Sequence, residues 1–255
     1  PDYAKFESAE PPLVLGLYPS PQPAGGPLNY VGLRFPDSAA LVEVQRRLEE
    51  ARTIETRSVA GPAAAVRWRE ATASIADPAA CPKYHGLRIT PQLGLLPIGL
   101  DAQSGLWEFA HLPSGEPAER GPDGGVVQHE GAGLVFVLIP GGTFWMGAQR
   151  EDPSGQNYDP TAQPNESPVH EVRLDPWFLS KFEVTQDQWQ RFTGKNPSLY
   201  GPDSVFAGER TTMLHPVEQV SWRIATTVLE RLDLLLPTEA QWERAARADT
   251  QTRWW

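Results

Sequence analysis

The first part of the chain carries an amphipathic helical pattern. Its apolar positions recur at spacings of three and four residues, which is the period of a helix with one buried face: Leu41, Val44, Leu48 and Ala51. Charged residues fill the opposite face, and Asp37 or Ser38 is a suitable N-cap. The sequence therefore predicts a helix that begins near Ser38 and presents a solvated charged face.

A second helix is predicted from Pro62 to about Ile75. Proline is favoured in the first turn of a helix, and Asp77-Pro78 ends this one because the residue before proline avoids helical dihedral angles. The predicted apolar face contains Ala65, Trp68, Ala71 and Ile75.

Short apolar runs separated by proline and glycine predict strands in the first 112 residues. These runs are 13–18, 30–35, 86–90, 93–98 and 106–111.

The second half of the chain has a more regular pattern. Residues 134–139 predict a buried strand, Pro140-Gly141-Gly142 a turn, and residues 143–147 the returning strand of a hairpin. Residues 148–168 lack periodicity and predict a long irregular loop. Residues 169–174 alternate as a further strand does.

Three helices are predicted after this loop. Thr185 caps the first, and Gly194 ends it. The second opens at Val220-Ser221-Trp222. Thr238 begins the last, and Gln241 completes a capping box three residues later. Trp242, with Ala245 or Ala246, is its expected core face.

Composition and charge narrow the classes of function. The chain has 26 prolines and 22 glycines among 255 residues, which favours short elements and irregular stretches over a helical bundle. The formal net charge of -10 argues against nucleic acid and anionic membranes as partners. The longest apolar run, 134–140, is too short to span a membrane, and no signal peptide is visible at the start. We expect a cytoplasmic protein.

These patterns predict an α+β fold with much irregular structure. Residues 1–112 form a smaller mixed region of unassigned role, 113–130 a linker, and 131–255 a second domain. The chain starts at Pro1 without methionine and ends on two tryptophans, so we expect that both ends are cut from a longer protein.

Four segments of the second half occur in an order and at spacings that resemble the formylglycine-generating enzyme, or sulfatase-modifying factor, family. They are 136–147 (Phe-Val-Leu-Ile-Pro-Gly-Gly-Thr-Phe-Trp-Met-Gly), 166–185 with its Glu-x-Pro and Phe-Glu-Val-Thr ends, 215–222 (His-Pro-Val-Glu-Gln-Val-Ser-Trp) and 236–247 (Leu-Pro-Thr-Glu-Ala-Gln-Trp-Glu-Arg-Ala-Ala-Arg). Phe182 stands where the family more commonly has tyrosine. Residues 105–111 resemble the approach segment of versions fused to bacterial Ser/Thr protein kinases.

The resemblance implies an irregular C-type-lectin-like (sulfatase-modifying factor) fold, here incomplete. It also implies an oxidase that converts a client cysteine to formylglycine with oxygen and a copper ion held by two cysteines, and calcium in a complete member. In the family these metal ligands come mostly from the later half of the domain. The chain has one cysteine, Cys81, outside the matching segment. We therefore assign no catalytic and no metal residue.

The remaining candidate residues are better explained by structural roles. His170 and His215 are expected to form structural hydrogen bonds. An acidic loop with Asp152, Asn157, Asp159 and Glu166 fits no EF-hand spacing, so we expect it to be solvated. Glu239 suits the start of the last helix, and Glu243 is placed to pair with Arg247.

The tryptophans are expected mostly in the core: Trp145, Trp177, Trp189, Trp222 and Trp242. Trp254 and Trp255 are the possible border of a peptide groove. Cys81 is expected to be a small, partly buried residue without special reactivity.

Three functions stay open at this point. The parent protein is an oxidase that makes formylglycine and acts on a protein or peptide client, or it uses a lectin-like scaffold as a binding or regulatory module of a signalling protein. An enzyme similar to ergothioneine synthases is the least supported, because residues 1–130 have only His85, His111 and His129 and no iron-binding motif.

Overall fold

The computed structural model describes residues 5–7, 14–17, 31–34, 49–206, 208–248 and 250. The chain divides into two compact units, Pro1–Ile54 and Glu55–Trp255. Trp254, Trp255 and most of the helix predicted from Ser38 lie outside the described residues. Residues 49–55 are helical, which agrees with the end of that helix.

The first unit contains a three-stranded antiparallel sheet in the order β1-β2-β3. Its strands are β1 (Lys5–Glu7), β2 (Val14–Leu17) and β3 (Val31–Arg34), and Leu15 of β2 pairs with both Phe6 and Leu33. The strands predicted at 13–18 and 30–35 are therefore confirmed.

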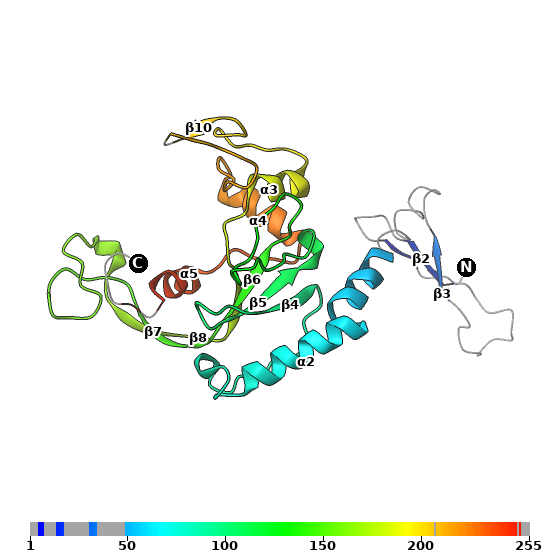
Figure 1. Ribbon diagram of the computed structural model, residues 1–255. Helices are drawn as coiled ribbons and strands as arrows, with labels where there is room; N and C mark the ends of the chain where they lie inside the picture. The colour runs from blue at the N-terminus through cyan, green and yellow to red at the C-terminus, as the bar shows by residue number, and fades with distance from the viewer. Residues whose placement is uncertain are drawn as a thin grey trace. The chain divides into compact units, whose positions relative to one another are not determined.

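The second unit is built on a four-stranded antiparallel sheet in the order β4-β5-β6-β9 (Figure 1). Its strands are β4 (Leu95–Leu100), β5 (Trp107–His111), β6 (Val135–Ile139) and β9 (Trp177–Ser180). β5 and β6 pair directly although residues 113–130 separate them in sequence. Both Ser114 and Ala118 of that segment are buried.

Helix α2 (Pro62–Ala76) packs against β4 and begins and ends as predicted. Its buried stripe, however, starts one residue earlier than expected. Ala64, Trp68, Ala71 and Ile75 are buried, whereas Ala65 is exposed. The spacing 4-3-4 keeps Ala64 in line with the other three, and Ala65 lies a further 100° around the helix.

The hairpin predicted at 134–147 is wrong. β6 pairs with β5 and β9, while β7 (Gly142–Met146) pairs with β8 (His170–Leu174) in a separate two-stranded sheet. Gly141 allows the chain to leave one sheet for the other, because a Cβ there would lie 2.8 Å from the Leu174 carbonyl oxygen. The strand predicted at 86–90 is also absent from this described region, although Leu87 and Ile89 pack against the core.

The three predicted C-terminal helices are present as α3 (Gln186–Thr193), α4 (Trp222–Glu230) and α5 (Glu239–Arg247). Thr185 and Thr238 each form a capping box, and Gly194 ends α3 in the left-handed conformation with a φ of 75°. Short elements complete the unit: η1 (Thr56–Ala60), η2 (Pro82–Tyr84), η3 (Leu112–Ser114), η4 (Pro164–Glu166), β10 (Val205–Phe206) and β11 (Glu209–Arg210).

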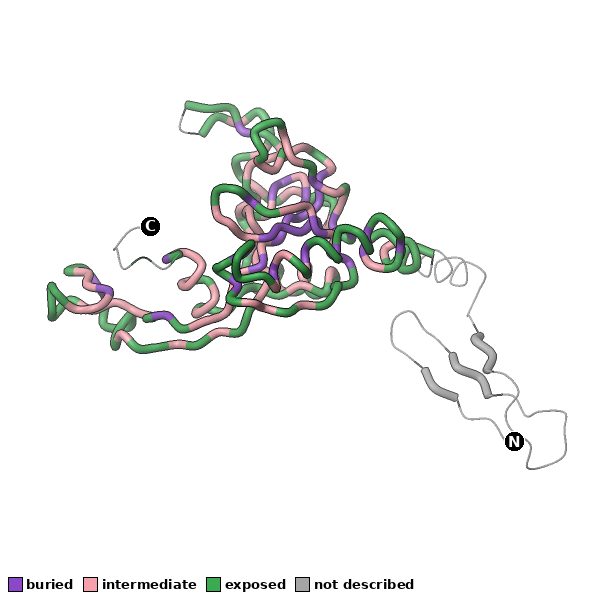
Figure 2. The backbone as a smooth tube through the Cα atoms, turned by 60° about the horizontal axis from the view of Figure 1, so that its bottom comes forward, coloured by how far each residue is buried: buried purple, intermediate pink, exposed green. Residues whose placement is uncertain are grey.

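One hydrophobic core lies between α2 and the four-stranded sheet, where buried residues gather in Figure 2. Phe109 stands at its centre, with its ring 5.4 Å from Trp68 and 5.1 Å from Phe178. Tyr84 reaches into the same core, where its hydroxyl donates to the Leu138 carbonyl and accepts from the backbone N–H of Trp107. Burial raises the pKa of this hydroxyl.

The expectation that the tryptophans are mostly core is wrong for three of the five. Trp189 is buried and Trp177 is partly buried, but Trp145, Trp222 and Trp242 are exposed. Trp145 lies on β7, Trp222 is the first residue of α4, and Trp242 lies on α5, so the three exposed tryptophans belong to three different elements. Within the described ranges, no helix has both the length and the apolar character of a membrane span.

Candidate functional site

Both histidines of the second half have the structural roles that the sequence predicts. Nδ1 of His170 lies 2.9 Å from the Pro168 carbonyl oxygen, and Nδ1 of His215 accepts a hydrogen bond from the backbone N–H of Thr212. These contacts hold local turns; His170 is exposed and His215 is partly buried.

The acidic loop does not bring its side chains together. Oδ1 of Asp152 accepts hydrogen bonds from the hydroxyl and backbone N–H of Ser154, which lower the pKa of this carboxyl. Asn157 points elsewhere and is buried. Among the residues that the structure describes, no group of three His, Cys, Asp or Glu side chains could hold a metal ion.

Cys81 does not fit a copper site. Its side chain is buried, and its sulfur lies 3.1 Å from the Ser74 hydroxyl inside the core of the second unit. Cu(I) prefers soft thiolate ligands, and this chain has no second cysteine to pair with Cys81. The residues present therefore do not provide the copper ligands that the family resemblance implies.

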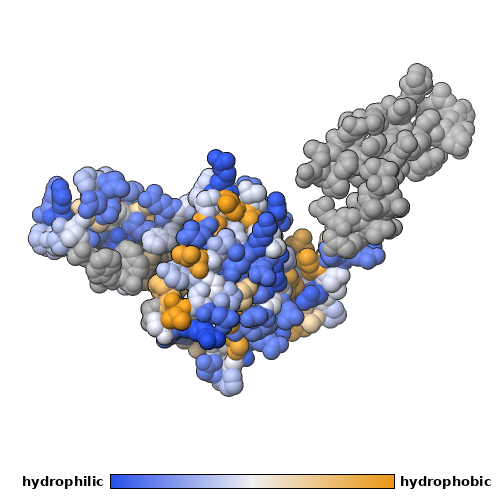
Figure 3. Space-filling model, turned by 90° about the horizontal axis from the view of Figure 1, so that it is seen from above, coloured by the Kyte–Doolittle hydropathy of each residue, from blue (hydrophilic) through white to orange (hydrophobic). Residues whose placement is uncertain are grey.

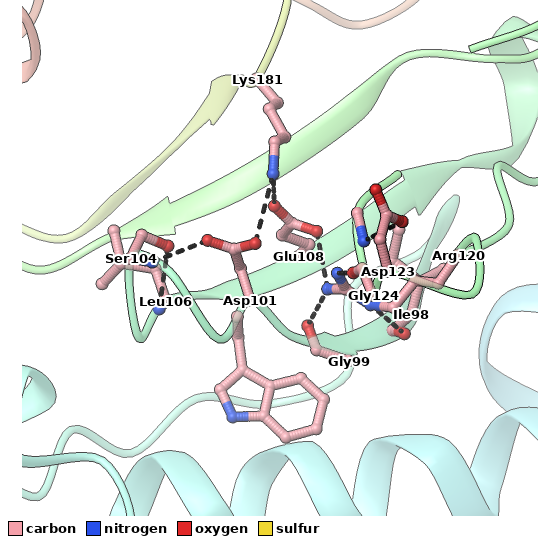
Figure 4. Close-up of polar contacts among 12 residues, drawn as sticks. Ile98, Gly99, Asp101, Ser104, Leu106, Glu108, Arg120, Asp123, Gly124 and Lys181 are labelled. Atoms are coloured by element: carbon pink, nitrogen blue, oxygen red, sulfur yellow. Dashed lines mark hydrogen bonds and ion pairs between the residues drawn. The ribbon is translucent and has the colours of Figure 1, made fainter. Parts of the chain in front are cut away.

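Four charged residues form a cluster around β5, an inner strand of the four-stranded sheet (Figure 4). Glu108 of β5 is its centre, with only 1% of its side chain exposed. One carboxylate oxygen contacts Arg120 Nη2 at 2.7 Å, and the other contacts Lys181. Lys181 also lies 3.6 Å from Asp101, so two cations face two carboxylates.

The sheet is shaped to admit Arg120. The pairing of β4 with β5 shifts between Pro97 and Gly99, and Gly99 has a φ of 126°. The guanidinium of Arg120 lies at this bulge and donates to the carbonyls of Ile98, Gly99 and Gly124. A side chain at position 99 would meet Arg120, because its Cβ would lie 3.3 Å from Nε.

Asp101 is the second carboxylate of the cluster and lies beside Lys181. Hydrogen bonds from Ser104 lower the pKa of the Asp101 carboxyl, and the nearby charges of Lys181 and Arg120 act in the same direction. Every charge in this cluster has an opposite partner. Such a cluster, fully paired around the buried Glu108 carboxylate, is a structural anchor between β5, the 113–130 segment and the residue after β9.

A second network connects two of the sequence segments at Gly147. The backbone N–H of Gly147 donates to Glu243 of α5 at 2.8 Å, and its carbonyl accepts from Arg247 and from the Asn157 amide. Glu243 also accepts from Arg247 Nε at 2.7 Å, which confirms the predicted pair. The end of β7 and α5, about a hundred residues apart in sequence, are thereby fixed together.

The other two segments meet at the start of α3. The backbone N–H of Gln186 donates to the His215 carbonyl, and that of Val217 donates to the Val184 carbonyl, each at 2.9 Å. Glu218 then accepts from the backbone N–H of Tyr200 at 2.7 Å. The four segments thus form two hydrogen-bonded pairs within the second unit.

Glu218 anchors the beginning of an exposed hairpin that the sequence did not predict. β10 and β11 pair antiparallel beyond Tyr200, and the rings of Tyr200 and Phe206 lie 4.9 Å apart in an edge-to-face arrangement. Leu199 and Val205 are exposed beside them. The sequence of this irregular stretch has no period that would have revealed the hairpin.

Comparison with known proteins agrees with these segments. Residues 127–255 match the FGE-sulfatase family, described as the sulfatase-modifying factor enzyme 1-like domain. Similar proteins include the formylglycine-generating enzymes of Thermomonospora curvata and Streptomyces coelicolor, which are 31% and 30% identical. Each match covers 44% of this chain, and 48% and 46% of those enzymes.

A kinase is also among the relatives. The serine/threonine-protein kinase pkn1 of Chlamydia pneumoniae is 32% identical over a match that covers 44% of this chain and 19% of the kinase. The chain thus spans about half the length of the formylglycine-generating enzymes that it matches, and a smaller part of the kinase.

Proposed function

Because the chain belongs to the sulfatase-modifying factor enzyme 1-like family, we propose that it is part of a domain that converts a client cysteine to formylglycine. The observation that supports this most is that the four family-like segments form two hydrogen-bonded pairs, above all through the Glu243–Arg247–Gly147 network. The 255 residues form the scaffold of this domain and do not oxidise a client by themselves.

The cysteine content supports a division of roles between these 255 residues, which form a scaffold, and further polypeptide that completes the domain. Two thiolates would be needed to hold copper in the way the family resemblance implies, and Cys81 is single and sealed in the core. The copper ligands would come from polypeptide outside this chain, as would calcium ligands. In this proposal the client is a protein or peptide, and the protein works in the cytoplasm.

We also propose a fold and limits for the family domain. The domain has the irregular C-type-lectin-like fold and occupies residues 131–255, with residues 113–130 as the approach to it. Trp254 and Trp255 border a peptide groove of the complete domain. Mixed helices and antiparallel sheets in the second unit support such a fold.

A peptide oxidation assay tests the division of roles. The 255-residue chain and the chain extended by its own downstream reading frame are each loaded with copper and incubated with a cysteine-containing sulfatase peptide. We expect formylglycine, detected by mass spectrometry, only with the extended chain. Turnover by the 255-residue chain that persists in Cys81→Ser would overturn it, as would inactivity of a copper-loaded extended chain.

The exposed hairpin favours a second function, that of a binding or regulatory module. Tyr200 and Phe206 present two rings to solvent on a hairpin that is fixed to the scaffold through Glu218. The similarity to a kinase points in the same direction. In this case the extended chain binds a peptide without oxidising it, and Phe206→Ala weakens that binding while leaving the stability of the core unchanged.

A further inference from the structure

The family match begins part of the way through one sheet. Residues 127–255, which we call the matched segment, contribute β6 and β9, whereas β4 and β5 come from residues 55–126, the upstream segment. Phe109 of β5 pairs with Phe136 of β6, and the backbone N–H of His111 donates to the Leu134 carbonyl at 2.9 Å. The four-stranded sheet therefore belongs to both segments.

The hydrophobic core is divided unequally between the two segments. Among the described residues it has eleven buried members, of which eight precede residue 127 and three, Leu134, Phe136 and Leu138, lie in the matched segment. The Tyr84 hydroxyl of the upstream segment donates to the Leu138 carbonyl at 2.9 Å. The upstream segment thus supplies most of the apolar support for β6.

Polar contacts extend this interface beyond the core. Lys181 of the matched segment contacts the carboxylate of Glu108, whose side chain is only 1% exposed. Arg191 Nη2 of α3 donates to the Ser114 carbonyl of the upstream segment at 3.3 Å. The upstream segment therefore holds both the residue that follows β9 and the helix that follows it in sequence.

The matched segment would lose these supports without the upstream segment. Its share of the sheet would be the pair β6–β9, and an isolated pair of strands is marginally stable in water. β6 would become an edge strand with unpaired backbone groups, and Phe136 and Leu138 would lose their cover. In the intact chain, hydrophobic residues form separate patches among hydrophilic ones on the face shown in Figure 3.

We propose that the upstream segment is a built-in folding partner of the matched segment. It binds the edge of β6 and the apolar face of β6 and β9, and the matched segment does not keep its fold without it. This gives a role to residues 55–112, which the sequence left unassigned. The inference is independent of whether the complete protein oxidises a cysteine, because its test measures association and not turnover.

Cutting the folded chain between the two segments tests the proposal. A protease recognition sequence is inserted between Asp123 and Gly124, which are both exposed in a turn closed by a hydrogen bond from the Gly121 N–H to the Gly125 carbonyl. The insertion is made in the 255-residue chain and in the chain extended by its own downstream reading frame. Size-exclusion chromatography and circular dichroism then follow the two pieces after cleavage.

We expect the two pieces of each cut chain to elute together at micromolar concentration and to keep the circular dichroism spectrum of the uncut protein. Phe109→Ala removes the ring at the centre of the interface and should raise the dissociation constant of the pieces at least about a hundredfold. Glu108→Gln leaves the apolar core intact and should raise it about a hundredfold. Phe206→Ala, on the exposed hairpin, is the control and should leave it unchanged.

Two results would overturn the proposal. The first is a matched piece that separates after cleavage and keeps its circular dichroism signal, in either the 255-residue or the extended chain. In the extended chain this result would mean that the added polypeptide supports β6 and β9 by itself. The second is the same dissociation constant in Phe109→Ala, Glu108→Gln and Phe206→Ala, with all three uncut variants folded.

Discussion

Trp68 and Trp222 both lie on α-helices of the second unit, but their surroundings differ. Trp68 is 2% exposed, with its ring 5.4 Å from Phe109 and its indole N–H donating to the Ser58 carbonyl. Trp222 is 74% exposed. The same residue type at the same helical period is therefore a core residue in one region and a surface residue in the other. What differs is whether a second layer of structure is present.

The largest expected effect concerns the hydrophobic core around Trp68. Phe109→Ala removes a fully buried ring between Trp68 and Phe178, and we expect it to lower the free energy of unfolding by about 3–5 kcal/mol. Urea denaturation followed by circular dichroism measures this. Phe206→Ala, on the exposed hairpin, serves as the control and should cost less than about 1 kcal/mol.

The charged cluster around Glu108 gives the next prediction. Glu108→Gln leaves Arg120 and Lys181 without their buried carboxylate, and breaking such a pair costs about 3 kcal/mol of stability. The exposed pair Arg210–Asp203 is the matched control, and Arg210→Ala should change stability by less than about 1 kcal/mol. Similar losses in the two variants would mean that Glu108 is not the anchor described above.

His111 makes the stability of the second unit sensitive to acid. Burial lowers the pKa of its ring from 6.5 to about 4, although Asp233 acts in the opposite direction. Its Nδ1 has no hydrogen-bond partner in the described structure. Since the unfolded chain binds a proton more readily, stability present above pH 6.5 is lost as the pH falls toward 4.

The size of this loss follows from the shift. One pKa unit corresponds to about 1.4 kcal/mol, so His111 accounts for about 3 kcal/mol between pH 6.5 and pH 4. Urea titrations at several pH values should show this slope in the native chain and a smaller one in His111→Phe. An unchanged slope in the variant would assign the acid sensitivity to other groups.

Much of the scaffold was predictable from local signals. Capping boxes at Thr185 and Thr238, the stop at Gly194 and the Glu243–Arg247 pair depend on residues within a few positions of one another. Such contacts are encoded in sequence spacing, and the structure confirms them. The four family-like segments are likewise recognisable from the order and spacing of their residues alone.

Apart from the one-residue shift in the buried stripe of α2 and the absent strand at 86–90, the failures concern contacts between distant residues. The Pro140-Gly141-Gly142 turn favours a hairpin locally, yet β6 joins β5 and β9 because the long-range pairing buries Phe136 and Leu138. The link between Glu108 and Arg120 depends on a bulge at Gly99, which no local pattern announces. The exposure of Trp222 is a further property that helical period alone does not report.

Gly147 tests the contact that fixes α5 to the sheet. Its φ is 91°, and a Cβ there would lie 2.5 Å from the Glu166 carbonyl oxygen. We expect Gly147→Ala to cost about 2–3 kcal/mol and to speed hydrogen exchange in α5. Gly194→Ala has a similar φ but open space around it, so it should cost about 1 kcal/mol and leave α5 unchanged.

The smallest expected effect concerns the exposed Trp222. In the 255-residue chain, Trp222→Ala removes a side chain that is mostly in water, so we expect the free energy of unfolding to change by less than about 0.5 kcal/mol. Trp68→Ala, the matched variant in the core, should cost about 3–5 kcal/mol. Urea denaturation of both variants gives the contrast directly. A large loss for Trp222→Ala would mean that Trp222 is already covered within these 255 residues. A small loss in this chain that becomes large in the extended chain would locate the covering layer in the added polypeptide.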